Sequence, residues 1–231
     1  MTETPGTSPD VVTDSIRLLA ERGWDATTVD QLAQAAGISR ATFFRKYGSK
    51  EDIVFADHAA NLERLERLLD RPGADPAVAL REGVLLVFRH HVDHRERTLA
   101  RHALLRQVPQ LRDRELITSH RYERVFRRWL RTALPDSPAR DTLATALSAA
   151  AVAVHNAYLR GWLRAPGTDP SAELAAQTER LARTLVAGFD DAAPPAGAPA
   201  AAPPRPAVVV TVLDPGAGTE EIVASVREAL A

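Results

Sequence analysis

The sequence contains no cysteine and almost no lysine. The first absence excludes disulfides, thiolate catalysis and zinc–thiolate sites. The only lysines are Lys46 and Lys50, and the formal net charge is −1, so a nucleic-acid role would need a local basic patch. The N-terminus is acidic and polar, unlike a signal peptide, and no apolar run approaches the roughly 18 residues that span a bilayer. We therefore expect a cytoplasmic protein with no membrane partner.

Helix periodicity and capping residues predict short helices near the N-terminus. The first covers 10–22 and stops at Gly23. We expect Thr27 to cap the second helix, with Asp30 completing a capping box. Ser39 is placed to cap a third helix over 40–47, and a longer helix should run from 50 toward 69. Three short helices joined by turns of this length are typical of a helix-turn-helix unit.

The rest of the chain to residue 191 is predicted to be helical, so the fold class is all-α with a short C-terminal strand-turn-helix extension. Amphipathic stripes indicate helices over 76–92, around 122–133, over 138–163 and over 170–190, and the last two are rich in alanine. The predicted divisions are a helix-turn-helix domain at 1–56, a helical ligand-binding and dimerisation domain at 57–191, an Ala/Pro linker at 192–206 and a strand–helix extension at 207–231.

The third short helix concentrates cations and rings. Phe43 and Tyr47 are four residues apart, on the face that should pack into the core. The outward positions should then be Arg40, Thr42, Phe44, Arg45 and Lys46. Lys50 falls in the first turn of the next helix, where a cation opposes the helix dipole and a phosphate partner would explain its placement.

The segment TTVDQLAQAAGISRATFFRKYGSKEDIV, within residues 10–56, resembles the DNA-binding segment of the TetR family of bacterial repressors. The resemblance implies a DNA-binding transcriptional regulator, with phosphate contacts from Thr28 and Ser39 and base-edge contacts from Arg40 and Thr42. It also implies that Phe44, Arg45, Lys46 and Lys50 line the DNA backbone. Position 44 is often tyrosine in the family, so Phe44 lacks a phosphate-binding hydroxyl. The Phe-Phe-Arg form is similar to a branch that includes mycofactocin-associated regulators.

A repressor of this kind reads a palindromic operator with two recognition helices about 34–36 Å apart. We expect a homodimer through the two late Ala-rich helices, and release from DNA by a small-molecule effector, such as an acyl-coenzyme A or another apolar ligand. The candidate pocket residues are aromatic or polar positions of the helical domain: Phe88, Phe126, Trp129, His155, Asn156, Tyr158 and Trp162.

Two further patterns have competing interpretations. The segment HHVDH places His90 and His94 at metal-pair spacing, but without a third ligand a hydrogen-bonded or solvated histidine cluster is favoured. The arginines between 97 and 131 suggest either a mouth for an anionic ligand or a solvated face, and the solvated face is favoured. We expect no metal and no cofactor.

The C-terminal segment Gly216-Ala217-Gly218 lacks the third glycine of a dinucleotide loop, so nucleotide binding is rejected. The strand expected in the 207–231 extension could pair with the same strand of a second copy across a dimer axis, or it could dock on the sheet edge of another protein. The chain shows no catalytic constellation, so we do not expect an enzyme. The remaining alternatives are a scattered catalytic set, or an architectural DNA-binding or interaction protein that takes no small ligand.

Overall fold

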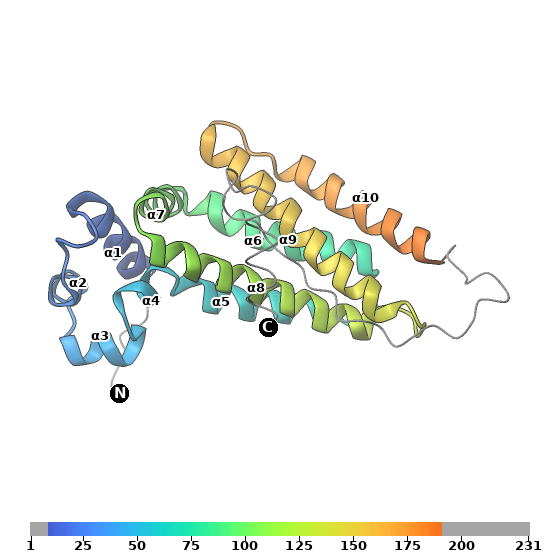
Figure 1. Ribbon diagram of the computed structural model, residues 1–231, viewed down its shortest axis with the longest axis horizontal. Helices are drawn as coiled ribbons and strands as arrows, with labels where there is room; N and C mark the ends of the chain where they lie inside the picture. The colour runs from blue at the N-terminus through green and yellow to red at the C-terminus, as the bar shows by residue number, and fades with distance from the viewer. Residues whose placement is uncertain (1–8, 191–231) are drawn as a thin grey trace, which may run out of the picture. The chain divides into compact units, whose positions relative to one another are not determined.

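A computed structural model describes residues 9–190, which form helices and no strands (Figure 1). In chain order the helices are α1 (Pro9–Arg22), α2 (Val29–Ala35), α3 (Arg40–Tyr47), α4 (Lys50–Val54), α5 (Asp57–Leu69), α6 (Pro76–Asp93), α7 (Arg95–Gln107), α8 (Pro109–Ala133), α9 (Arg140–Arg164) and α10 (Ser171–Asp190). The all-α prediction is confirmed for these residues. The linker and the strand–helix extension expected at 192–231 lie outside the described residues.

The capping of α2 differs from the prediction by one residue. Thr28, not Thr27, has the extended backbone of an N-cap, and it forms a capping box with Gln31 rather than with Asp30. Thr27 is buried and donates its hydroxyl to the Gly23 carbonyl oxygen at 2.9 Å. The sequence offers two adjacent threonines, and burial of the first leaves the second to cap the helix.

The continuous helix expected from 50 to 69 is wrong, because the chain breaks between α4 and α5. The amides of Phe55, Ala56 and His58 bond to carbonyls three residues earlier, which ends the α-helical pattern. The Phe55 side chain is buried at this break. As a result, α5 begins at Asp57 with its own direction.

The C-terminal helices form a bundle in which α6 packs against α5, α9 and α10, and α8 packs against α5 and α9 (Figure 1). Their shared core is built from leucines, alanines and aromatic rings, with Phe88, Leu65 and Leu130 fully buried. The next helix in sequence after α6, α7, packs against α1 and also contacts α6 and α8. It therefore joins α1 to the bundle.

A second hydrophobic core lies under α1–α4, and its members come from both sides of the predicted boundary at residue 56. Leu19, Leu32 and Phe43 are buried with Leu104 from α7 and Leu111 from α8. The helix-turn-helix unit and the start of the bundle thus share one packed interior.

Among residues 9–190, α9 alone has an 18-residue window apolar enough to cross a membrane, by length and composition only. Only 33% of that window is buried within this one chain. The expectation that no apolar stretch reaches this length missed α9, whose many alanines carry no charge.

Candidate DNA-binding surface and ligand cavity

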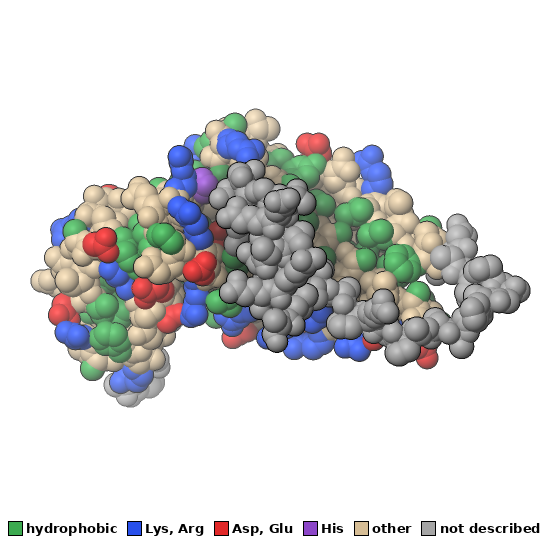
Figure 2. Space-filling model, viewed as in Figure 1, with side chains coloured by type: hydrophobic (Ala, Val, Ile, Leu, Met, Phe, Trp, Pro, Cys, Tyr) green, Lys and Arg blue, Asp and Glu red, His purple; other side chains and the backbone are tan. Residues whose placement is uncertain are grey.

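Helix α3 divides its side chains between core and solvent as the sequence predicted. Phe43 is fully buried and Tyr47 is 7% exposed, with their ring centroids 5.2 Å apart. Arg40, Arg45 and Lys46 are exposed, and Phe44 is 41% exposed although it is a large apolar ring. Thr42, which was also predicted to point outward, is half-buried. Cationic and hydrophobic side chains are interspersed on the end of the molecule that carries these helices (Figure 2). An exposed ring among cations on a short helix suits a nucleic-acid surface.

Local contacts orient the polar residues of this surface. The Ser39 hydroxyl caps α3 by accepting the Thr42 amide hydrogen at 3.1 Å, and Thr28 caps α2 in the same manner. Arg40 pairs with Asp30 at 3.1 Å and lies 5.5 Å from the centre of the Phe44 ring. Because the Arg40–Asp30 pair is solvent-exposed, it contributes little stability and is open to exchange for another acceptor.

Lys50 lies in a different environment from its neighbours. Its ammonium donates to the carbonyl oxygens of Trp24 at 2.6 Å and Thr27 at 3.1 Å, and lies 4.3 Å from the centre of the Trp24 ring. These carbonyls and the indole ring stabilise the cation that the start of α4 disfavours. Lys50 therefore ties α4 to the loop before α2 in this structure.

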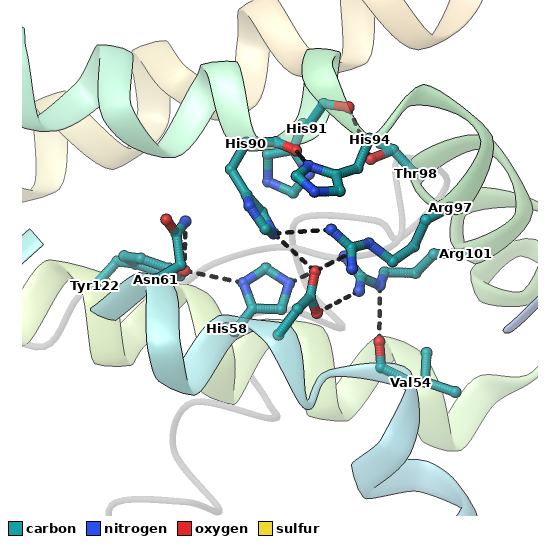
Figure 3. A network of polar contacts seen from close by, with 11 residues as sticks. Val54, His58, Asn61, His90, His91, His94, Arg97, Thr98, Arg101 and Tyr122 are labelled. Carbon is teal, nitrogen blue, oxygen red and sulfur yellow. Dashed lines mark hydrogen bonds and ion pairs between the residues drawn. The ribbon is translucent and has the colours of Figure 1, made fainter. Parts of the chain in front are cut away.

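A buried ionic network lies where α5, α6 and α7 meet (Figure 3). The Asp57 carboxylate contacts Arg101 at 2.5 Å, His90 at 2.8 Å and Arg97 at 3.3 Å, and none of the four side chains is more than 10% exposed. Burial favours the protonated carboxyl, but the charge of Arg101 and the other partners outweigh it and hold the pKa of Asp57 well below its usual value. Two guanidiniums thus share one buried carboxylate.

The solvated-face interpretation is wrong for Arg97 and Arg101, which are 2% and 4% exposed. Their buried partner, Asp57, is 44 residues from Arg101, so helix periodicity gave no sign of it. The hydrogen-bonded interpretation of the HHVDH histidines is confirmed: His90 contacts Asp57, and the His94 ring contacts the His90 carbonyl at 3.0 Å. Within 9–190 no group of three or more histidines and acids could hold a metal ion.

A cavity of about 60 Å³ lies inside the bundle. Its walls come from α5, α6, α7, α8 and α9 and from Phe55 before α5, and are mostly apolar. Of the candidate pocket residues, Phe126, His155 and Asn156 line it. Phe88 is fully buried with its ring 5.9 Å from that of His155. Phe88 and the three remaining candidates, Trp129, Tyr158 and Trp162, pack in or against the same core without lining the cavity.

The polar part of the cavity wall includes His58, His91, Arg101 and Tyr122. Of these, the sequence patterns suggested a ligand role for Arg101 alone, as one of the arginines of a possible mouth for an anionic ligand. His58 and His91 are separated by more than a helix in the chain, yet their ring centroids lie 5.8 Å apart. Burial lowers the pKa of His58 to about 3 and that of His155 to about 4, and it lowers the pKa of His91 as well. All three histidines are therefore neutral near pH 7.

Comparisons with known proteins agree with this geometry. The family model described as bacterial regulatory proteins, tetR family, matches residues 12–56. MftR of Mycobacterium tuberculosis, assigned as a regulator of mycofactocin biosynthesis, is 35% identical over 114 residues, 46% of this chain and 54% of that protein. EthR of Mycolicibacterium smegmatis is 30% identical over 101 residues, 42% of this chain and 46% of its own. The chain thus spans about half the length of these curated relatives.

Among solved structures, FadR of Bacillus subtilis in complex with stearoyl-CoA has a TM-score of 0.54 at 16% identity, over 77% of this chain and 97% of that one. A regulator from Mesorhizobium loti has a TM-score of 0.51 at 15% identity, over 80% and 98%. At these identities the likeness concerns the fold alone. Residues 12–56 thus match the DNA-binding segment of the TetR family, and the chain is similar in sequence and in fold to transcriptional regulators of that family.

Proposed function

We propose that this protein is a homodimeric repressor that acts in the cytoplasm, binds a palindromic operator through α2 and α3, and leaves DNA when a small molecule occupies the bundle cavity. No enzymatic reaction is part of the proposal. The observation that carries it is the position of Arg101, which lines the cavity and also bonds to the DNA-binding unit.

The proposed DNA contacts follow the exposed face of α3. Arg40 and Thr42 read base edges, because the N-terminal turn of a recognition helix meets the floor of the major groove. The remaining contacts are to the sugar–phosphate backbone, from Thr28, Ser39, Phe44, Arg45 and Lys46. We assign Lys50 a positioning role instead, because its ammonium is already bonded to two carbonyl oxygens.

The proposed dimer interface is formed by α9 and α10. Two-thirds of the apolar window of α9 is not buried within one chain, and a long apolar face of this kind is normally covered. Small residues along it let a second copy approach closely, as in a four-helix bundle. Analytical ultracentrifugation checks this step, and a monomer at micromolar concentration would contradict it.

Arg101 supplies a physical link between the cavity and the DNA-binding helices. Its Nε donates to the carbonyl oxygen of Val54, the last residue of α4, at 2.8 Å, and its guanidinium carbon lies 5.8 Å from the centre of the Phe55 ring. Arg114, next to the cavity-lining Glu115 on α8, pairs with Asp52 of α4. A ligand that shifts these side chains would shift α4, which packs on α1 and α3.

The effector class is proposed from the cavity wall and from the fold neighbour. The walls are mainly apolar, and FadR of Bacillus subtilis was solved in complex with stearoyl-CoA. We therefore propose an effector with a large apolar part for this chain too. Both an acyl-coenzyme A, which has an anionic head, and an uncharged amphipathic molecule have such a part.

The test is selection of bound DNA from a random pool, followed by fluorescence anisotropy on the selected operator. Arg40→Ala should weaken operator binding by about 1–3 kcal/mol and relax sequence choice, whereas Lys46→Ala should weaken binding to all sequences and lower the salt slope by about one. Arg67→Ala is the control, because Arg67 lies on α5, outside the proposed DNA-binding and dimer helices, and its side chain is 67% exposed. If no sequence were enriched, or if Arg40→Ala bound like the control, the proposed mode of DNA recognition would be wrong.

One observation favours a second candidate, an architectural regulator without a small ligand. The cavity of about 60 Å³ is smaller than pockets for drug-sized molecules, which measure about 300–1,000 Å³. In that case DNA selection would succeed, but no ligand would change the affinity for DNA.

A further inference from the structure

The hydrogen-bond directions inside the cavity wall can be worked out from Arg101, because a guanidinium only donates. The terminal guanidinium nitrogen of Arg101 lies 3.2 Å from Nε2 of His58. Because Arg101 donates, Nε2 of His58 carries the lone pair. The hydrogen of the neutral His58 ring is then on Nδ1, which lies 3.0 Å from the Tyr122 hydroxyl oxygen (Figure 3). His58 therefore donates to Tyr122.

The Tyr122 oxygen accepts a second hydrogen bond, from Nδ2 of Asn61 at 3.3 Å. In this orientation of the Asn61 amide, which leaves its Oδ1 buried without a hydrogen-bond partner, both neighbours donate to the Tyr122 oxygen and the phenolic hydrogen has no acceptor in this group. Tyr122 lines the cavity and is only 6% exposed. The cavity wall thus offers one hydrogen-bond donor at Tyr122.

His155, on α9, offers a hydrogen-bond acceptor, whereas Tyr122 offers a donor. Its Nδ1 lies 3.1 Å from the amide oxygen of Asn156, which can only accept, so Nδ1 carries the hydrogen. The lone pair is then on Nε2, which is buried and has no hydrogen-bond partner among the described residues. His155 is 8% exposed and lines the cavity. An unpaired buried acceptor of this kind calls for a donor on the ligand.

Charge restricts the ligand further. The positive charge of Arg101 is already paired with Asp57, so an anionic head gains no free counter-charge there. A charged head of either sign would also have to leave its water for a mainly apolar wall, which is costly. Apolar side chains supply the rest of the wall, such as Val84, Val152 and Leu159.

From this arrangement we infer that the effector is an uncharged amphipathic molecule with a terminal hydroxyl, which accepts a hydrogen bond from Tyr122 and donates one to Nε2 of His155. Its apolar part lies along the valine and leucine side chains of the wall, and because a ten-carbon chain is larger than a cavity of about 60 Å³, binding must widen the cavity. The inference rests on the proposed function, since it names the head group of the effector that the cavity takes. A hydroxyl is the smallest group that satisfies both requirements without carrying charge.

The experiment titrates the full-length protein at pH 7.5 with four probes of ten or eleven carbons: 1-decanol, decyl methyl ether, decanoate and decylamine. The alcohol should bind tightest by calorimetry. The ether accepts from Tyr122 but cannot donate to His155, so it should bind about tenfold more weakly, the factor expected for one buried hydrogen bond. The two charged probes should bind more weakly than the ether.

Variants assign the contacts. His155→Phe should lower alcohol affinity to that of the ether and leave the ether unchanged, while Tyr122→Phe should weaken both. His120→Phe is the matched control, because His120 is exposed and does not line the cavity. If His155→Phe does not fold, the alcohol–ether comparison on the unaltered protein still decides.

Three outcomes would overturn the inference: equal affinity for alcohol and ether, tighter binding of decanoate or decylamine, or no binding of any probe. Operator binding is measured on the same preparations. Intact operator binding with any of these outcomes would refute the hydroxyl ligand alone, whereas loss of sequence-specific DNA binding would refute the proposed function.

Discussion

Replacing Asp57 with asparagine tests whether the buried network stabilises this fold. The substitution keeps the size and one acceptor oxygen but removes the carboxylate that Arg97 and Arg101 share. Both guanidinium side chains are at most 5% exposed, so neither can regain water without opening the structure. Removing one partner of a buried ion pair typically costs about 3–5 kcal/mol, because it leaves an uncompensated buried charge.

A loss of that size is large beside the about 5–15 kcal/mol that separates folded from unfolded domains. Urea unfolding followed by circular dichroism, at equal protein concentrations since the proposed dimer makes stability concentration-dependent, would measure it. The matched control is Asp136→Asn, where the side chain is 90% exposed and pairs with Arg140 at 3.1 Å. That change should cost at most about 1 kcal/mol.

Acid titration supplies a second readout for Asp57. Its folded pKa is depressed, so its contribution to stability is present above the unfolded pKa of about 3.9 and is lost as the pH falls through the folded value. Asp57→Asn should therefore flatten the loss of stability below about pH 4. A variant as stable as the Asp136→Asn control, with an unchanged acid limb, would refute the view that this network holds a buried charge.

The remaining predictions concern titration, packing and the Lys50 contact. His58 and His155 have folded pKa values of about 3 and about 4, so below pH 6.5 the unfolded chain binds more protons than the folded protein. Each of the two histidines should therefore lower the free energy of unfolding by about 2 kcal/mol between pH 7 and pH 5. A free energy of unfolding that stays constant over that range would contradict their burial. Gly83→Ala should destabilise the fold by about 1–3 kcal/mol, since a Cβ there would lie 2.8 Å from a ring carbon of Phe126. Gly167→Ala is the control, because a Cβ there meets no atom within 4 Å, and it should change thermal stability by less than about 0.5 kcal/mol. Lys50→Met should lower the melting temperature and leave the salt slope of DNA binding unchanged; a reduced slope at unaltered stability would instead place Lys50 on a phosphate.

Local rules predicted most of the helices because each is marked by its own residues. Ser39, Gly37 and the spacing of Phe43 and Tyr47 define α3 without reference to anything distant. The two errors in this region, at Thr27 and at the break after Val54, arise where tertiary burial decides between locally equivalent choices. The sequence does not show which of two adjacent threonines will be buried. It also does not show where burial of a side chain will interrupt a segment that could form one helix.

The residues of the candidate site also fall into those that local pattern predicts and those that only tertiary packing brings together. The outward side chains of α3 follow from helix periodicity, so the exposed positions could be predicted. The buried network could not, because Asp57 meets Arg101 and His90 only after α5, α6 and α7 have packed together. Arg97 and Arg101 belong to an arginine-rich segment that suggests a solvated face, but both pair with the buried Asp57 carboxylate, which is distant in the sequence.

The shared core of the DNA-binding helices and α7 bears on how chimeric regulators should be cut. Exchanging residues 1–56 for those of a TetR-family regulator would place foreign side chains against Leu104 and Leu111, which are 2% and 0% exposed. Close-packed interiors tolerate such mismatched volumes poorly. A transplanted DNA-reading head would need its own α7 and the first turn of α8, so the exchangeable module of this protein is discontinuous in sequence.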